Sequence, residues 1–279
     1  MTMEHLDMPP FQSDQQQRFS EAAAILLQRR RNGSKGERLP ESCRPQNLDQ
    51  ALAIQTEVSA QSGDKIAAWK CGMPGANTVV LAPIYANTVF QEADTCPVWS
   101  DQQCARIEPE LAFILGRDLP ARAESYTVAE IDAAIRETRL ALELIGTRYS
   151  YPDAATFAEH LADGLFNQGL CLGPVIHTDI HTDIHTDDAA NLQTMPIKIS
   201  CAGHTPQEFS GVHPAGNPRA PLYWLVEFLR NRGQGLQAGQ AIITGSYAGS
   251  PDVPLHEDIS VSFGLLGELH VRFISKTSA

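Results

Sequence analysis

The sequence predicts an α+β fold in which a small N-terminal helical lobe precedes a sheet-rich body. Two segments with helical composition lie within the first 63 residues. From about Asp64 onwards, short apolar runs are broken by Gly and Pro, as is typical of strands joined by turns. We therefore expect a disordered N-terminus over residues 1–18, the helical lobe over residues 19–63 and one larger domain over residues 64–279.

The helical lobe is predicted from two segments. Phe19–Arg31 is followed by Gly33, a residue that commonly ends helices. Asn47–Ser59 places Leu48, Leu52, Gln55 and Ser59 at helical spacing, and Asn47 can act as its N-cap. Two packed helices are therefore expected before the sheet begins.

The larger domain is predicted to alternate strands with a few helices. The expected strands are Ile66–Lys70, Arg106–Leu115, Gly169–Leu172, Ile197–Cys201, Ala241–Thr244, Ile259–Phe263 and Glu268–Phe273. The expected helices are Val128–Ala141, Ala154–Leu161 and Ala220–Arg232, the last with a clear apolar stripe.

Composition excludes several classes of protein. Acidic residues number 33 against 21 basic ones, and this net charge of -12 argues against a nucleic-acid partner. Met1–Gln17 is polar where a secretory signal would be apolar, and no apolar run approaches the ~20 residues that cross a membrane. The six cysteines form no C-x-x-C pair, so neither a zinc ribbon nor a redox motif is indicated. We expect a soluble, cytoplasmic protein.

A short repeat places His177, His181 and His185 at a period of four residues. Such spacing could gather the three imidazoles on one side for metal capture. We favour a solvated surface loop grown by duplication, because loops tolerate insertions at little cost. The active site is not expected there.

The strongest chemical signal lies in the predicted strand Arg106–Leu115. Residues two apart share a face of a strand, so Glu108 and Glu110 should point the same way, with Arg106 on that side. Adjacent carboxylates repel, and Mg²⁺ or Mn²⁺ would compensate their charge. Pro109 lacks an N–H group and suits an edge or bulge. A solvated strand face is the alternative.

A third acid, Glu143, stands alone in the apolar run Leu140–Ile145. A buried carboxylate is costly unless it is paired or bound to a metal. Arg148 could be its ion-pair partner, which would make the acid structural.

Together, Glu108, Glu110, Glu143 and Arg148 resemble the Glu-x-Glu…Glu metal triad of the 2-keto-4-pentenoate hydratase and 4-oxalocrotonate decarboxylase family, within the fumarylacetoacetate hydrolase superfamily. The resemblance extends over roughly residues 20–273. It is carried by further segments in the family's order: Gln50–Gln55, Trp69–Gly72 with the active-site lysine, Ala162-Asp163 ten residues before Gly173, Gly216–Pro218, Trp224-Leu225, Ile243–Ser246 and Leu266–Phe273.

The resemblance implies a fumarylacetoacetate-hydrolase-like mixed sheet, with residues 64–279 as the catalytic domain. It also implies that Glu108, Glu110 and Glu143 bind Mg²⁺ (or Mn²⁺) and act with Lys70 as catalytic residues. The residues implied to bind substrate are Arg148, Asp163, Thr244 and Ser246. The resemblance further suggests a homo-oligomer that can associate with a partner enzyme of its pathway.

The implied activity is a lyase of aromatic catabolism acting on a 2-hydroxy-2,4-dienoate or a related 2-oxo acid through an enolate-like species. Hydration is the favoured reaction. Decarboxylation of an oxalocrotonate- or oxaloacetate-like acid is the first alternative. C–C bond hydrolysis, for which Glu159-His160 or His256-Glu257 could supply a base, ranks third. A non-catalytic relative that binds 2-oxo acids is the remaining possibility.

Serine-hydrolase and phosphate-loop motifs are absent from the sequence.

The sequence departs from the family at the expected proton-transfer carboxylate, where it has Ile84. Gly164 replaces the family's Asn, and bulkier residues occupy the following 165–167 stretch. We therefore expect Lys70 to supply the proton, and we expect Ile84→Asp to raise hydratase activity towards small dienoates.

Overall fold

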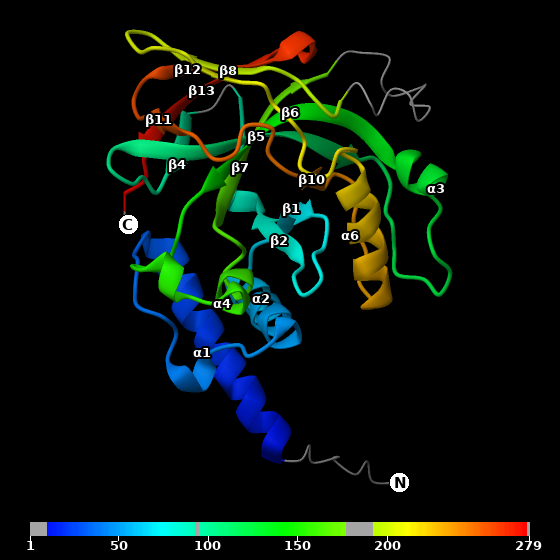
Figure 1. The fold of residues 1–279 in the computed structure, drawn as a ribbon. Helices are drawn as coiled ribbons and strands as arrows, with labels where there is room; N and C mark the ends of the chain where they lie inside the picture. Colours follow the sequence, from blue (N-terminus) through cyan, green and yellow to red (C-terminus); the bar gives the residue numbers. More distant parts are fainter. Residues whose placement is uncertain (1–9, 93–94, 177–191, 278–279) are drawn as a thin grey trace. The chain divides into compact units, whose positions relative to one another are not determined.

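The computed structural model describes residues 10–92, 95–176 and 192–277 (Figure 1). The chain divides into two compact units, a helical unit of residues 1–63 and 147–165 and a sheet unit of residues 64–146 and 166–279. The predicted sheet-rich fold with N-terminal helices is confirmed. The histidine repeat at His177, His181 and His185 lies outside the described residues.

The helical unit is built around α1 and α2. Its elements are α1 (Pro10–Asn32), η1 (Glu41–Cys43), α2 (Leu48–Ser62), η3 (Pro152–Ala154) and α4 (Phe157–Ala162). Asn47 caps α2 as expected, because its side chain accepts a hydrogen bond from the Gln50 amide. The buried Gln55 donates to the Leu161 carbonyl over 2.8 Å and thereby ties α2 to α4.

Two features of the helical unit differ from the prediction. Helix α1 begins at Pro10, although disorder was expected as far as residue 18. The first turns of α1 are rich in Gln, which is a good helix former. A polar sequence in this segment is therefore compatible with a helix. Residues 147–165 also belong to this unit, although they were assigned to the domain beginning at residue 64. The reason is that α4 packs against α2.

The first sheet of the sheet unit has the strand order β2-β1-β10-β5-β6-β7-β3, and β11 also pairs with β5. Its strands are β1 (Ile66–Gly72), β2 (Val80–Tyr85), β3 (Val89–Gln91), β5 (Cys104–Leu115), β6 (Ile135–Ile145), β7 (Asn167–Val175), β10 (Ala241–Ile243) and β11 (Asp252–Pro254). The pairs β1–β10 and β3–β7 are parallel and the others are antiparallel.

The second sheet has the order β4-β13-β12-β8-β9 and lies over β5, β6 and β7 in Figure 1. Its strands are β4 (Thr95–Val98), β8 (Ile197–Cys201), β9 (Gln207–Phe209), β12 (Asp258–Phe263) and β13 (Glu268–Ser275). The two sheets pack closely, since a Cβ atom on Gly173 of β7 would meet the Leu269 side chain of β13 at 2.5 Å. The remaining elements are α3 (Val128–Asp132), α6 (Ala220–Asn231), η2 (Ala86–Thr88) and η5 (Gly264–Leu266).

The predicted helix Val128–Ala141 is wrong over most of its length. A capping box of Thr127 and Glu130 does start a helix, but α3 ends at Asp132. The chain then enters β6, which hydrogen-bonds to β5 on one side and β7 on the other. The central part of β6 is buried, and its apolar run suits a strand covered on both faces.

Strand register determines which side chains share a face of the first sheet. Glu108 of β5 lies opposite Glu143 of β6, and Lys70 of β1 lies opposite Ile243 of β10. Directly paired residues project to the same side, and so do residues two apart in one strand. The register therefore brings Lys70, Glu108, Glu110 and Glu143 to one face.

The same face continues into an apolar cluster of buried residues. The cluster comprises Ala68, Ile84, Ala112, Ile114, Ala141, Leu170, Leu172, Ala241 and Ile243, with Val89 packed against it. Ile84 is fully buried within this cluster, opposite Ala68 of β1. Ile84 therefore packs among apolar side chains of the sheet, on the same face as the charged residues.

We expect Ile84→Asp to lower the free energy of unfolding by about 3 kcal/mol or more, since it places a carboxylate among apolar side chains. Urea unfolding followed by circular dichroism measures this. Ile84→Val is the matched control and should cost only about 1 kcal/mol. The opposite result would be an aspartate variant that is as stable as the control and has raised hydratase activity. It would support the expectation from the sequence that a carboxylate at position 84 can take part in proton transfer.

Candidate metal centre

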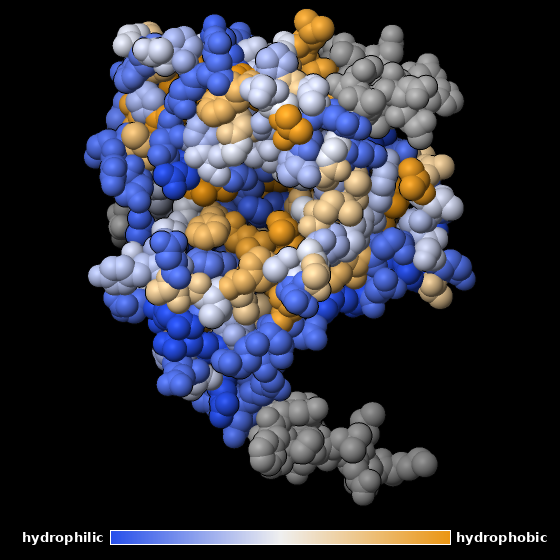
Figure 2. Space-filling model, viewed as in Figure 1, coloured by the Kyte–Doolittle hydropathy of each residue, from blue (hydrophilic) through white to orange (hydrophobic). Residues whose placement is uncertain are grey.

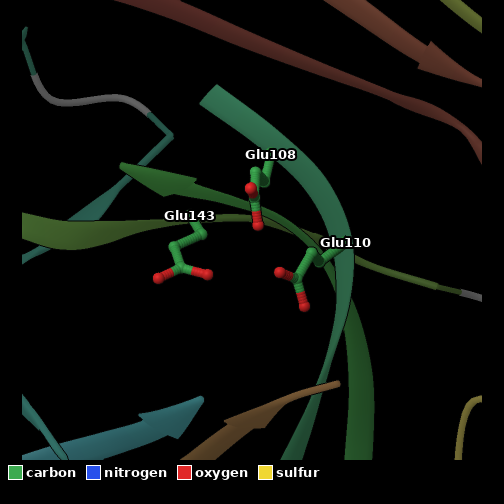
Figure 3. Close-up of side chains that lie close together, drawn as sticks. All are labelled: Glu108, Glu110 and Glu143. Atoms are coloured by element: carbon green, nitrogen blue, oxygen red, sulfur yellow. The ribbon is translucent and has the colours of Figure 1, made fainter. Parts of the chain in front are cut away.

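Three carboxylates converge on the charged part of this sheet face. One oxygen from each of Glu108, Glu110 and Glu143 lies within 4.8 Å of the other two. Glu108 and Glu110 come from β5, and Glu143 reaches them from β6 (Figure 3). Glu110 and Glu143 are buried, whereas Glu108 is partly exposed. The structure thus brings together the three residues in which the sequence suggested a metal site.

Glu143 is held by two nitrogen donors. The Lys70 ammonium lies 2.8 Å from Glu143 Oε1, and the Asn167 amide donates to the same oxygen over 2.9 Å. The other oxygen, Oε2, is buried and has no hydrogen-bond partner among the described residues. The two donors therefore orient the Glu143 carboxylate through Oε1 and leave Oε2 without a donor among the described residues.

The two glutamates of β5 are oriented by the turn region that follows β10. The Gly245 amide donates to Glu110 Oε2 over 2.6 Å, and the Ser250 hydroxyl donates to Glu108 Oε1. Gly245 has φ +134, which favours glycine, and a Cβ atom there would meet Pro214 at 2.7 Å. A glycine is needed so that its amide can approach Glu110.

The electrostatics of the cluster favour an added cation. Burial, together with the charges of Glu143 and Glu108, raises the pKa of Glu110 well above its ordinary value. Burial also contributes most to the raised pKa of Glu108. For Lys70, burial alone would lower the pKa, but the surrounding glutamates raise it, so its ammonium stays charged.

The residues present fit a divalent metal ion. When all three carboxylates are ionised beside the one ammonium, two negative charges remain, and a divalent cation would neutralise them. Oxygen ligands suit hard cations such as Mg²⁺, and the buried, unpartnered Glu143 Oε2 offers one of them. Glu108, Glu110 and Glu143 are therefore the candidate ligands, with Lys70 beside them.

The cluster lines a cavity of about 400 Å³ within the sheet unit. Its lining residues are Lys70, Cys71, Gly72, Met73, Val80, Glu108, Glu110, Glu143, Pro214, Ala215, Thr244, Gly245 and Ser246. Near β1, β5 and β10 the molecular surface is hollowed, and hydrophilic residues in its depth adjoin hydrophobic ones (Figure 2). A small acid with an apolar tail matches this combination of surfaces.

Thr244 and Ser246, both expected to bind substrate, line the cavity but differ in what their hydroxyl groups contact. The Ser246 hydroxyl donates to the Gly249 carbonyl over 2.7 Å and accepts from the Ala248 amide, so it stabilises a turn. Thr244 is buried, and its hydroxyl lies 3.4 Å from His213 Nε2. Thr244 is therefore the better candidate donor to a bound molecule.

Arg148 and Asp163, also expected to bind substrate, belong to the helical unit. Arg148 Nε donates to Asp163 Oδ2 over 2.7 Å, and both side chains are buried. Arg148 is thus an ion-pair partner of Asp163, whereas the acid considered for it in the sequence was Glu143. Their role in substrate binding remains a prediction.

Sequence reasoning missed Asn167, Ser250 and His213 as parts of the site. Asn167 and Ser250 hydrogen-bond to two of the three carboxylates, and His213 contacts Thr244. Asn167 starts the strand that pairs with β6, so a correct register for that pair would have placed it near Glu143. No spacing rule links Ser250 or His213 to the glutamates, because both come from irregular segments.

Comparison with known proteins agrees with this architecture. Residues 56–274 match the family described as fumarylacetoacetate (FAA) hydrolase C-terminal, and the chain belongs to this family. Among curated proteins it is similar to the 2-keto-4-pentenoate hydratase of Paraburkholderia xenovorans, with 26% identity over 82% of this chain and 85% of that protein. The hydratase of the same name from Burkholderia vietnamiensis is 24% identical over 80% of this chain and 85% of its own.

Among solved structures, 4-oxalocrotonate decarboxylase from Pseudomonas putida, complexed with calcium and acetate, has a TM-score of 0.68. The match covers 92% of this chain and 98% of that one at 19% identity, and it shows a shared fold. The same decarboxylase complexed with magnesium and adipate gives a TM-score of 0.66 at 18% identity.

The raised pKa of Glu110 predicts how the metal-free protein responds to pH. A carboxyl whose pKa is higher in the folded state stabilises the fold below its unfolded pKa of about 4.5, and that stabilisation is lost as pH rises through the folded value. We expect the melting temperature of metal-free protein to fall between about pH 5 and pH 8, and Glu110→Gln to melt roughly 2 °C or more above wild type at pH 8.

Differential scanning fluorimetry with and without Mg²⁺ measures both effects. Mg²⁺ should raise the melting temperature of the wild type, more at pH 8 than at pH 5 because the ion competes with protons. The Glu110→Gln variant should lose most of that rise. Equal responses of the two proteins to Mg²⁺ would contradict the assignment of Glu110 as a ligand.

Proposed function

We propose that this protein is a divalent-metal-dependent lyase that hydrates a 2-hydroxy-2,4-dienoate or a related 2-oxo acid. The observation that carries the proposal is the group of three carboxylates with Lys70 on the wall of a cavity of substrate size. The names of the curated relatives, 2-keto-4-pentenoate hydratases, support this reaction class. Mg²⁺, or Mn²⁺, is the proposed ion, held by Glu108, Glu110 and Glu143.

When bound, such an ion would supply positive charge that stabilises negative charge developing on a substrate oxygen. The chain's own residues have separate roles. Lys70 places an ammonium beside Glu143 at the cavity wall and can donate to an anionic oxygen of the substrate. Its raised pKa makes it a lasting positive charge, which favours this role over that of a readily released acid.

The cavity favours hydration of a monocarboxylic acid over decarboxylation of a dicarboxylic one. Among the described residues that line it, Lys70 is the only cationic side chain. Met73, Val80, Pro214 and Ala215 give the remaining wall an apolar character. A second substrate carboxylate would lose hydration there without gaining an ion-pair partner. Decarboxylation remains the second candidate, because the same metal site stabilises the same charge and the solved decarboxylase shares the fold.

C–C bond hydrolysis has weaker support. Glu159 is buried in the helical unit, pairs with Arg38 over 2.7 Å and caps α4, so it is committed to structure. The imidazole of His160 hydrogen-bonds to the Pro152 carbonyl. His256 adopts a positive φ in the turn that precedes β12, and it is absent from the cavity lining. Neither histidine-containing pair is among the residues that line the cavity.

Location and assembly remain parts of the proposal. No helix in the described portion of the chain is both long and apolar enough to cross a bilayer. All six cysteines are free thiols. We propose that the protein is cytoplasmic, because free thiols are usual in a reducing compartment. We propose a homo-oligomer that associates with a pathway partner enzyme, which size-exclusion chromatography with light scattering can test.

Glu110→Gln should reduce hydration of 2-hydroxypenta-2,4-dienoate to background, because it removes a ligand charge with little change in volume. Loss of the dienoate absorbance in the presence of Mg²⁺ measures the rate. Circular dichroism should show an intact fold. A variant with wild-type turnover would rule out a catalytic role for the cluster.

Lys70→Met should lower the rate of dienoate ketonisation by about a hundredfold or more, since it removes the cation nearest the carboxylates. Lys70→Arg keeps the charge and serves as the control. We expect arginine to restore part of the rate if charge is what matters. A methionine variant as fast as wild type would show that Lys70 does not stabilise the anionic oxygen of the substrate.

A further inference from the structure

His213 is a buried histidine directly behind the cavity wall. The residue is only 2% exposed, and the Tyr247 ring packs edge-on against the imidazole with a centroid separation of 5.1 Å. Tyr247 is fixed in turn, because its hydroxyl donates to the Leu192 carbonyl over 2.7 Å and its amide donates to the Pro109 carbonyl. The imidazole therefore has a fixed position relative to strand β5.

Hydrogen bonds on the two ring nitrogens determine which nitrogen carries the proton. The Ala215 amide donates to His213 Nδ1 over 3.2 Å, so Nδ1 must present a lone pair. Burial without a compensating anion lowers the pKa of His213 to about 4, so the ring is neutral at physiological pH. A neutral imidazole that is unprotonated at Nδ1 carries its proton at Nε2.

The Nε2 proton leaves one arrangement for the Thr244 hydroxyl. Thr244 Oγ1 lies 3.4 Å from His213 Nε2, and no other hydrogen bond of this hydroxyl occurs among the described residues. Because Nε2 donates, Oγ1 must accept, and the hydroxyl proton remains available for another acceptor. Thr244 lines the cavity together with the three carboxylates and Pro214, so that acceptor would be a bound molecule.

We propose that His213 is a positioning residue that makes the Thr244 hydroxyl a directed hydrogen-bond donor to an anionic oxygen of the substrate. This inference rests on the proposed function, because it assumes that a 2-oxo acid or its enol occupies the cavity. A donor oriented before substrate binds needs no reorganisation during the reaction. Thr244 would touch the substrate, whereas His213 would act only through Thr244.

A double-mutant cycle tests the coupling between the two residues. Thr244→Val removes the hydroxyl at nearly constant shape and should lower kcat/KM roughly tenfold to a hundredfold, as expected for losing a hydrogen bond to a charged group. His213→Met removes the Nε2 donor and should lower kcat/KM by about threefold to tenfold. In the Thr244→Val background, His213→Met should have less than about a twofold further effect.

Conservative variants and metal binding separate positioning from a general structural role. His213→Gln retains a donor near the Nε2 position and should restore most of the rate, as should Thr244→Ser. The rise in melting temperature with Mg²⁺ should be unchanged in every variant, since none alters a ligand. If His213→Met lowers kcat/KM by the same factor in both backgrounds, His213 is merely structural and the proposal is overturned.

Nitrogen-15 NMR of histidine-labelled wild-type protein tests the tautomer without any assay of activity. We expect the His213 signals of a neutral ring protonated at Nε2 from pH 5 to pH 8. A ring protonated at Nδ1, or a charged ring, overturns the proposal even if every variant folds poorly. A different result would contradict the proposed function itself: a wild type that shows no response to Mg²⁺ and no turnover of the dienoate.

Discussion

The pairing of β5 with β6 is the constraint on which the site depends. It places Glu108 directly opposite Glu143, while Glu110 lies two residues further along the same face. Burial, and then the close approach of the other carboxylates, raises the pKa values of Glu108 and Glu110, so the cluster is unfavourable in the absence of a cation. A shift of one residue would send Glu143 to the opposite face and abolish the cluster.

The apolar cluster on the same sheet face has an electrostatic effect on the site. Ile84, Ala112 and Ile243 are buried beside the charged residues and exclude water from that side. Interactions among Lys70 and the glutamates are therefore stronger than they would be in solvent. The face thus combines two functions, since its apolar part holds the strands together and its charged part forms the candidate metal centre.

Irregular segments complete the site by orienting what the strands provide. Gly245 and Ser250 each direct one carboxylate of β5, and Asn167 directs Glu143. His213 contacts Thr244 in the same way, although Thr244 is a prospective substrate contact and not a metal ligand. Such oriented groups need little rearrangement when a ligand binds.

The sequence alone indicated the α+β class, most strands and two candidate ligands, because strand periodicity and the Glu108-Pro109-Glu110 motif are local properties of the chain. The third candidate ligand, Glu143, came from the resemblance to a known family. The sequence did not determine that residues 135–141 form a strand, since an apolar run is compatible with helix and strand alike. Nor did it determine that Ile84 lies in the apolar cluster, that Arg148 pairs with Asp163 or that Asn167 meets Glu143. Those relations depend on strand register and on contacts between residues far apart in the chain. Only the tertiary structure determines both.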